Sequence, residues 1–155
     1  MIRKTVLYDA FTGISPMEKS AVVSFLSTNT ANASDDDVRE AVEYAVKHKP
    51  SFGGFILVAQ EGRKIIAAIV ANRTGMEGYG PKNIFVFVSF DQTHAENKVI
   101  AKKLLQKAID HADGDVALHV EPNSPSMQLY RNLGFKNQYL ELRLNRKQTS
   151  PLGMR

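Results

Sequence analysis

The segment that most restricts the fold is an apolar run at residues 84–90, with the sequence IFVFVSF. A strand with apolar side chains at odd and even positions needs cover on both faces of its sheet, so we expect a central strand here. Residues 98–112 follow it, and their apolar side chains recur at helical spacing. The two elements together predict an α/β protein in which helices pack on a sheet.

Two helix starts are visible in the first third of the chain. Ser15, Pro16 and Glu18 have the spacing of a capping box with proline at the first helical position. Ser34 precedes three aspartates, whose charges suit the first turn of a second helix. A short strand is expected at residues 4–8, ahead of both helices.

The remaining segments alternate between strand and helix patterns. Strands are predicted at residues 55–59, 64–71, 116–121 and 139–144, with a hairpin turn at 60–63 and a loop at 72–83. A short helix that Asn123 caps and Gly134 ends is predicted between the last two strands. In the final strand, Leu140, Leu142 and Leu144 are expected to point inward. The resulting order, βααβββαβαβ, predicts one mixed α/β domain over residues 4–144.

Composition excludes several classes of protein. The chain has 155 residues and no cysteine, which suits one domain and excludes disulfides, thiolate metal sites and a cysteine nucleophile. Its apolar runs are too short to span a bilayer, and no apolar signal core follows the N-terminus, so a cytoplasmic protein without membrane contact is expected.

Positive charge is concentrated at the C-terminal end. The net charge is +4, and residues 136–155 carry five basic side chains against one acid. Without a nucleic-acid-binding motif, we interpret residues 145–155 as a basic, flexible tail, and nucleic-acid binding is the least favoured function.

The segment 117–135, ALHVEPNSPSMQLYRNLGF, resembles the GNAT superfamily of acyl-CoA N-acyltransferases. The match lies in Leu129, Tyr130, Leu133, Gly134 and Phe135, at the family's spacing. The resemblance implies a mostly antiparallel sheet with helices on both faces. It also implies transfer of an acetyl or short acyl group from acetyl-CoA to a primary amine of a small molecule or peptide, by direct attack in a ternary complex.

The resemblance further assigns roles to individual residues. Tyr130 would protonate the departing CoA thiolate, and a buried core aromatic is the structural alternative. Asn123 would lie near the pantetheine arm, or would simply cap its helix. The strand at 84–90 would bind the pantetheine amides, with Val88 and Phe90 near the acyl end.

The family's pyrophosphate motif, (Gln/Arg)-x-x-Gly-x-(Gly/Ala), is degenerate in this chain. Ala101 fits the motif, but Val99 replaces its glycine and Glu96 replaces its Gln or Arg. Glu96 places a negative charge near a diphosphate, whereas Lys98, Lys102 and Lys103 restore positive charge. The stretch assigned to CoA binding is Glu96, Asn97, Lys98, Val99, Ile100, Ala101 and Lys102. Its departures keep open an alternative, a non-catalytic GNAT-fold module that binds a ligand or a partner.

Other site assignments are less specific. His119 and Glu121 share one face of the predicted strand at 116–121, where either could accept the amine proton, although a polar outer face explains them equally well. Glu77 and Tyr79, in the glycine-rich loop, are candidates for contacting the amine. No histidine pair has metal-ligand spacing, so no metal site is expected. Open strand edges are compatible with a homodimer.

Overall fold

The computed structural model describes residues 3–31, 33–47, 53–76, 78 and 80–146. The chain forms two compact units, Met1–Pro122 and Asn123–Arg155. The first unit contains β1 (Arg3–Tyr8), α1 (Pro16–Asn29), α2 (Asp35–Val46), β2 (Gly54–Glu61), β3 (Lys64–Arg73), β4 (Asn83–Phe90), α3 (Glu96–His111) and β5 (Val116–Leu118). The second unit contains the short helix α4 (Met127–Asn132). Among the described residues, no helix combines the length and apolar character needed to cross a bilayer.

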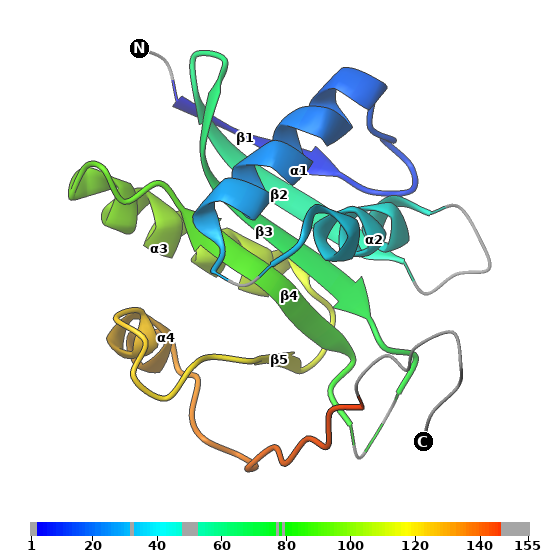
Figure 1. The fold of residues 1–155 in the computed structure, drawn as a ribbon, viewed down its shortest axis with the longest axis vertical. Coiled ribbons are helices and arrows are strands. Elements are labelled where there is room, and N and C mark those ends of the chain that lie inside the picture. The colour runs from blue at the N-terminus through cyan, green and yellow to red at the C-terminus, as the bar shows by residue number, and fades with distance from the viewer. Residues whose placement is uncertain (1–2, 32, 48–52, 77, 79, 147–155) are drawn as a thin grey trace. The chain divides into compact units, whose positions relative to one another are not determined.

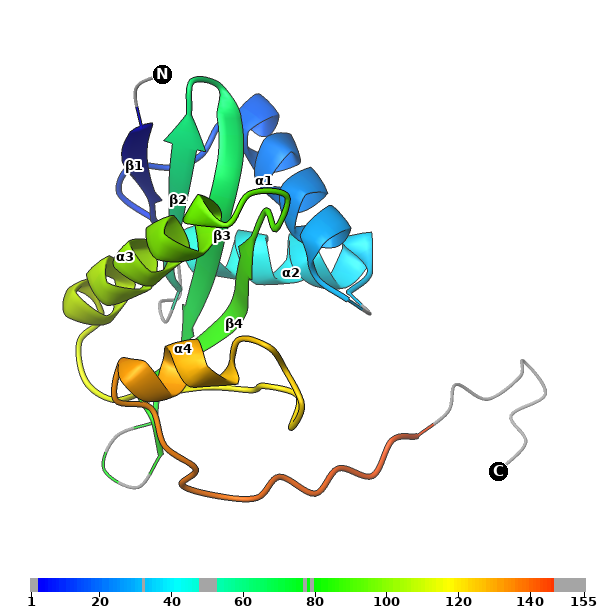
Figure 2. The same cartoon turned by 90° about the vertical axis from the view of Figure 1, so that its left-hand side faces the viewer.

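One five-stranded sheet forms the centre of the first unit (Figure 1). The strands lie in the order β1-β2-β3-β4-β5, and every neighbouring pair is antiparallel except β4 with β5. Helices α1 and α2 pack on one face, and α3 packs on the other (Figure 2). The predicted fold class, a mostly antiparallel sheet with helices on both faces, is confirmed.

Side-chain hydrogen bonds begin the first two helices where the sequence predicts them. The Ser15 Oγ accepts from the Glu18 N–H at 3.1 Å, and the Glu18 Oε1 accepts from the Ser15 N–H at 2.9 Å. The Ser34 Oγ accepts from the Asp37 N–H at the start of α2. These bonds satisfy N–H groups that have no acceptor within their own helix.

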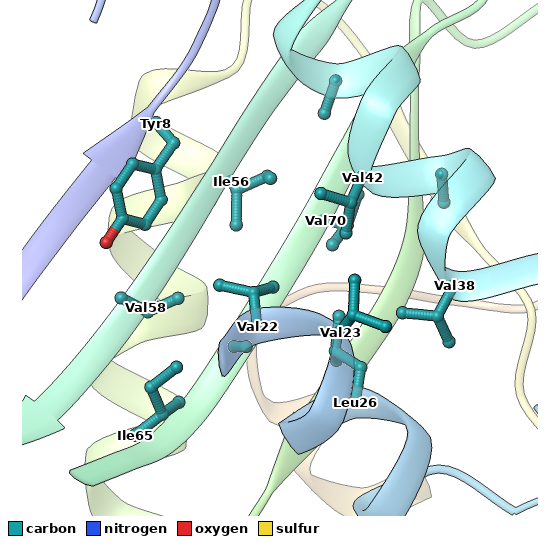
Figure 3. Packing of buried hydrophobic residues seen from close by; sticks show 13 residues of the cluster. Tyr8, Val22, Val23, Leu26, Val38, Val42, Ile56, Val58, Ile65 and Val70 are labelled. Carbon is teal, nitrogen blue, oxygen red and sulfur yellow. The ribbon is translucent and has the colours of Figure 1, made fainter. Parts of the chain in front are cut away.

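The main core lies between the sheet and helices α1 and α2 (Figure 3). Ile56 and Val58 of β2 point to this side, and Val22, Leu26 and Val42 of the helices meet them with no more than a trace of exposed surface. Because side chains alternate along a strand, the residues between them point to the opposite face. There the centroid of the Phe55 ring lies 6.3 Å from that of the Phe85 ring and 4.6 Å from that of the His111 ring of α3.

The strand at 84–90 is not the central, fully covered strand that its composition predicts. It lies fourth in a sheet of five, and β2 and β3 are the continuously buried strands. Val86 is 41% exposed, and Phe87, Val88 and Phe90 are partly exposed. The apolar run therefore reflects a strand whose outer half is covered only in part by the described residues.

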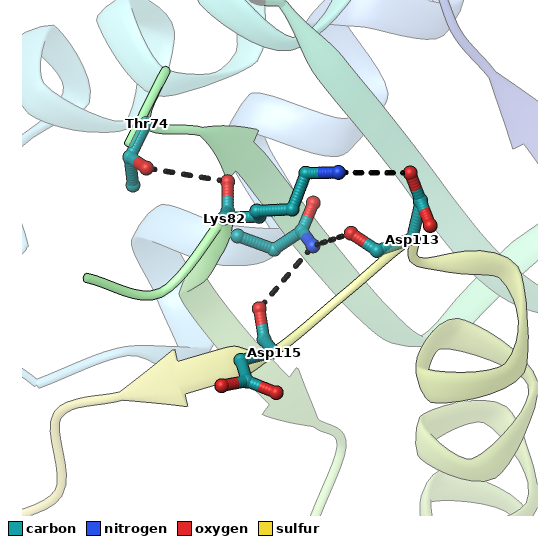
Figure 4. A network of polar contacts seen from close by, with 5 residues as sticks. Thr74, Lys82, Asp113 and Asp115 are labelled. Atoms are coloured by element: carbon teal, nitrogen blue, oxygen red, sulfur yellow. Dashed lines mark hydrogen bonds and ion pairs between the residues drawn. The ribbon is translucent and has the colours of Figure 1, made fainter. Parts of the chain in front are cut away.

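A polar network fixes the start of β4 against the turn that follows α3 (Figure 4). Asn83 is 2% exposed, and its Nδ2 donates to the carbonyls of Asp113 (2.8 Å) and Asp115 (3.3 Å). Lys82 Nζ lies 3.1 Å from Asp113 Oδ2, and Thr74 Oγ1 donates to the Lys82 carbonyl. The network fastens the first residues of β4 to the segment that enters β5.

Three other predicted elements differ from the structure. The strand expected at 116–121 ends at Leu118. The segment 139–144, expected to be a strand, is irregular chain without a ladder among the described residues, and its leucines, expected to point inward, are exposed. An alternating pattern gives a strand only where a neighbour supplies hydrogen bonds, and within the described residues this segment has none. The third difference concerns Asn123 and is described with α4 below.

Candidate functional site

The outer half of β4 has a strand neighbour on one side only. Strand β5 pairs with Asn83, Ile84 and Phe85, and no described residue pairs with β4 on that side beyond them. Strand β3 continues along the other side as far as Phe90. The backbone of residues 86–90 therefore presents an open edge, on which N–H and C=O groups can hydrogen-bond to a bound molecule.

A β-bulge separates the paired half of β4 from the open half. In the ladder with β3, Phe85 faces Ala71 and Phe87 faces Val70, which leaves Val86 as an extra residue. A bulge bends its strand and re-aims the side chains that follow. Composition alone did not reveal this bulge, because Val86 fits the apolar pattern of its neighbours.

Val88 and Phe90, expected near the acyl group, both lie on this open half. Their side chains are partly exposed, so they can line an apolar surface for a ligand. Ser89, between them, is 7% exposed, and its Oγ lies 2.5 Å from the Thr30 Oγ1 at the end of α1. This contact holds the open half of β4 against α1.

The loop after β4 is held by Asp91. Its N–H donates to the Ile66 carbonyl, and its Oδ1 accepts from the Thr93 N–H at 2.9 Å. Lys64 Nζ lies 3.2 Å from Asp91 Oδ2. The hydrogen bonds from Thr93, and then Lys64, hold the pKa of Asp91 at about 2, so the carboxylate stays charged at neutral pH. We overlooked Asp91, although an Asp two residues before a Thr is a signal for this turn.

Asn97 closes the same loop from inside α3. It is 5% exposed, and its Nδ2 donates to the Asp91 carbonyl at 2.9 Å. Its side chain is therefore committed to the loop. This hydrogen bond joins the first turn of α3 to the residue that begins the loop.

Helix α3 begins with unsatisfied backbone donors. Its N-cap residue, Ala95, provides no side-chain cap. Among the described residues, no group accepts from the N–H of His94, Ala95 or Glu96. Free N–H groups at the positive end of a helix suit an anion such as a phosphate. The open edge of β4 leads through residues 91–95 directly to these donors.

The residues expected to bind CoA form the first turns of α3, and several face solvent. Val99 lies inside the helix and is 57% exposed, so no positive φ is needed where the family has glycine. Ala101 is buried against the sheet side of the helix. Glu96 begins the helix, where an acid also suits the dipole. Those on the exposed surface are Glu96, Lys98, Val99 and Lys102.

The two candidate bases do not lie on a strand. His119 and Glu121 follow the end of β5 in irregular chain, and both are exposed. The shared strand face predicted for them is wrong, because the ladder with β4 stops at Leu118. Glu77 and Tyr79 lie outside the described residues.

The second unit starts α4 without the cap that we expected. The N-cap is Ser126, with no side-chain cap, and Asn123 is exposed in a turn before it. The Ser124 Oγ instead accepts from the Ser126 N–H at 3.1 Å. The predicted capping role of Asn123 is therefore wrong, because this residue lies three positions before the N-cap residue, Ser126.

The end of α4 explains why Tyr130, Gly134 and Phe135 occur at their spacing. Gly134 has a φ of +104°, its N–H donates to the Arg131 carbonyl, and the Phe135 N–H donates to the Tyr130 carbonyl at 3.1 Å. These bonds form a Schellman motif. The Tyr130 and Phe135 rings meet edge to face with centroids 6.1 Å apart, which supplies the apolar contact typical of that motif.

Tyr130 also has the properties of a proton donor. It is 7% exposed, and burial raises the pKa of its phenol above the ordinary value of 10.0. The phenol is therefore protonated at neutral pH. No described residue hydrogen-bonds to its hydroxyl, so the proton is not committed to another protein group.

Solved structures share this fold at low sequence identity. A GNAT-family acetyltransferase from Streptococcus pneumoniae TIGR4 matches with a TM-score of 0.67 and 14% identity, over 94% of this chain and 100% of that chain. An aminoglycoside N-acetyltransferase in complex with CoA gives 0.65 and 13%, over 96% and 98%. A ribosomal-protein-alanine N-acetyltransferase from Brucella melitensis biovar Abortus 2308 gives 0.61 and 12%, over 93% and 99%.

Comparison of the sequence with protein-family models identifies the family of this chain. No curated protein matches the chain significantly. The model of the acetyltransferase (GNAT) family, however, matches residues 20–135, a range that includes the bulged strand, the uncapped start of α3 and the Tyr130 turn. With a match over most of its length and the same fold, the chain belongs to the GNAT acetyltransferase family.

Proposed function

We propose that this protein transfers an acetyl or short acyl group from acyl-CoA to a primary amine, by direct attack in a ternary complex. The observation that carries the proposal is the continuity of the open edge of β4 with the free N–H groups at the start of α3. A molecule with an amide-bearing arm at one end and a diphosphate at the other matches this pair of features. Acyl-CoA has both parts.

Each part of acyl-CoA has candidate partners in the chain. The backbone of residues 86–90 would hydrogen-bond to the pantetheine arm, and Val88 and Phe90 would contact its acyl end. The N–H groups of His94, Ala95 and Glu96 would bind the diphosphate. Lys98 and Lys102, exposed on the next turn of α3, add positive charge. Acyl-CoA supplies an activated thioester to the amine.

The chain also offers groups for the two proton transfers. The protonated phenol of Tyr130 would give its proton to the sulfur as the carbon–sulfur bond breaks. The attacking amine must lose a proton, and His119 or Glu121 would accept it directly or through water. The acceptor would be a small-molecule or peptide amine, as the aminoglycoside and ribosomal-protein-alanine acetyltransferases of similar fold suggest.

Ligand-dependent stabilisation tests the first half of the proposal. We expect acetyl-CoA at 100 times its Kd to stabilise the fold by about 2.7 kcal/mol, a rise in Tm of roughly 5–10 °C. Pantetheine, which lacks the diphosphate, should stabilise it much less. No shift with millimolar acetyl-CoA would contradict the proposal and favour the non-catalytic module. Thiol release measured over a panel of amines would then identify the acceptor class.

Glu96→Arg is expected to strengthen CoA binding. The change removes a negative charge at the start of α3 and adds a guanidinium that can bind a phosphate through two hydrogen bonds. A gain of about fivefold or more is expected at low salt, from an exposed charge contact worth roughly 1 kcal/mol. Calorimetric titration at low and high salt measures it.

Glu40→Arg is the matched control for this variant. Glu40 is an exposed acid on α2, so its replacement changes the net charge equally without approaching α3. If both variants bind CoA alike, the gain comes from overall charge. If Glu96→Arg binds CoA no better than the unmodified protein, the diphosphate does not lie at the start of α3.

A further inference from the structure

Two hydroxyl side chains join the end of α1 to the outer half of β4. The Ser89 Oγ lies 2.5 Å from the Thr30 Oγ1, so one hydroxyl donates to the other. Ser89 is 7% exposed, and Thr30 is the half-buried C-cap residue of α1. Only two oxygens that share a hydrogen can come this close, because carbon atoms in contact lie about 3.5–4.0 Å apart. The pair therefore sets a shorter spacing between α1 and β4 than apolar side chains would allow.

Ser89 faces the side of the sheet that α1 and α2 cover. In the ladder with β3, Ser89 lies opposite Ala68 and Phe87 lies opposite Val70. Ala68 and Val70 belong to the core beneath those helices, and Phe87 packs against it. Paired residues of neighbouring strands share one face of the sheet. The contact with Thr30 therefore fixes how far β4 lies from α1, whereas the β3 ladder fixes its place within the sheet.

Val88 and Phe90 face the opposite side, on which α3 lies. Val88 is paired with Ile69 and Phe90 with Ala67, and these two residues of β3 alternate with the core residues described above. Helix α3 packs against β3 on that side. Because Ser89 lies between Val88 and Phe90, its distance from α1 also sets how far these two side chains extend toward the α3 side.

We propose that Ser89 and Thr30 act as a spacer that sets the length of the acyl group that the protein transfers. This inference rests on the proposed function, in which Val88 and Phe90 contact the acyl end of acyl-CoA. Both hydroxyls belong to positioning residues, since they act through the strand rather than on the substrate. A greater distance between α1 and β4 advances Val88 and Phe90 against the acyl chain. One methylene group in an apolar site changes kcat/KM by roughly 10- to 200-fold, so a shift of about 1 Å is large enough to alter acyl selectivity.

Thr30→Val tests the spacer. Valine has nearly the shape of threonine, and its methyl group in place of the hydroxyl needs about 1 Å more distance from the Ser89 Oγ. The outer half of β4 is expected to move away from α1, so the ratio of kcat/KM for acetyl-CoA to that for butyryl-CoA should rise by about fivefold or more. The KM for acetyl-CoA should change little, because its diphosphate would bind at the start of α3. Thiol release with one amine acceptor measures both constants, and an unchanged ratio would overturn the proposal.

A second substitution separates spacing from hydrogen bonding. In Thr30→Val with Ser89→Ala, no side-chain oxygen lies opposite the valine methyl, so β4 can return and the ratio should recover most of its original value. Thr30→Ser keeps the hydroxyl and should keep the ratio. Thr28→Val makes the same replacement at an exposed position of α1 and should also leave the ratio unchanged. If the double variant keeps the altered ratio, the hydroxyls act through their hydrogen bond and the spacer is wrong.

Folding and the proposed function need separate controls. Urea unfolding compares the stability of each variant with that of the unmodified protein. Ser89→Val places the larger group on the strand, where valine is favoured, and the same rise in the ratio is expected there if Thr30→Val does not fold. A protein that releases no thiol from acetyl-CoA with any amine contradicts the proposed function and the spacer together. A protein that turns over acetyl-CoA, with the ratio unchanged in Thr30→Val, contradicts the spacer alone.

Discussion

Replacing Tyr130 with phenylalanine is expected to lower kcat by roughly 10²- to 10⁴-fold, with little change in the KM for acyl-CoA. The change removes one hydroxyl, and general acid catalysis typically accelerates a reaction by a factor of this size. The phenol matters mainly while the thiolate leaves, so its loss affects the chemical step rather than ground-state binding. Single-turnover measurements of thiol release separate that step from product release.

The fold should tolerate this substitution. Tyr130 takes part in the turn after α4 through its carbonyl, which accepts from Phe135, and through its ring, which packs on that residue. Phenylalanine retains both contacts. Tyr44→Phe is the control, because it also removes a phenol, one that donates to the Arg73 carbonyl. A loss below about threefold for Tyr130→Phe would assign the proton to solvent and leave Tyr130 a packing role.

Gly54→Ala is expected to destabilise the fold by about 3 kcal/mol or more. A Cβ at this position would lie 1.9 Å from the Ala71 carbonyl oxygen and 2.8 Å from its carbon, and both atoms belong to the backbone of β3. Gly54 pairs with Asn72 in the adjoining ladder, so neither strand can move without breaking hydrogen bonds. Overpacking against a side chain costs 1–3 kcal/mol, and a backbone clash falls at the upper end or beyond.

Urea unfolding measures this loss, and Gly13→Ala provides the comparison. Gly13 has a φ of +68°, and a Cβ there would meet nothing within 4 Å. That variant carries the cost of left-handed backbone, roughly 1–2 kcal/mol, without a clash. Equal losses for the two variants would show that β2 and β3 can separate at Gly54.

Local signals predicted the helices of the first unit well. The capping residues Ser15 and Ser34 act within three residues of their partners, so neighbouring sequence contains the whole interaction. Gly134 likewise ends α4 through bonds to residues close by in the chain. The turn after α4 depends on the same short range, which is why its sequence revealed the family resemblance.

Non-local contacts explain the errors. Residues 139–144 alternate as a strand should, but a strand also needs a partner, which the pattern does not supply. The apolar run of β4 predicts burial equally well whether protein or a ligand covers it. Asn97 stays assigned to the stretch that would bind CoA, and the sequence did not predict that its side chain donates to the carbonyl of Asp91, six residues away. Only the three-dimensional structure reveals that the N–H groups of His94, Ala95 and Glu96 have no acceptor among the described residues.

The network around Asn83 has a mechanical consequence. The strands β4 and β5 are joined at one end by the Asn83 amide and three ladder positions, and past the bulge β4 continues with β3 as its only strand neighbour among the described residues. A small rotation of one strand about this joined end produces a larger displacement farther from it. Side-chain changes near Asn83, Asp113 or Asp115 would therefore alter the distance between the open half of β4 and the chain that follows β5. They would do so without changing any residue of that half. A related chain could adapt to a longer or shorter acyl group by such remote changes.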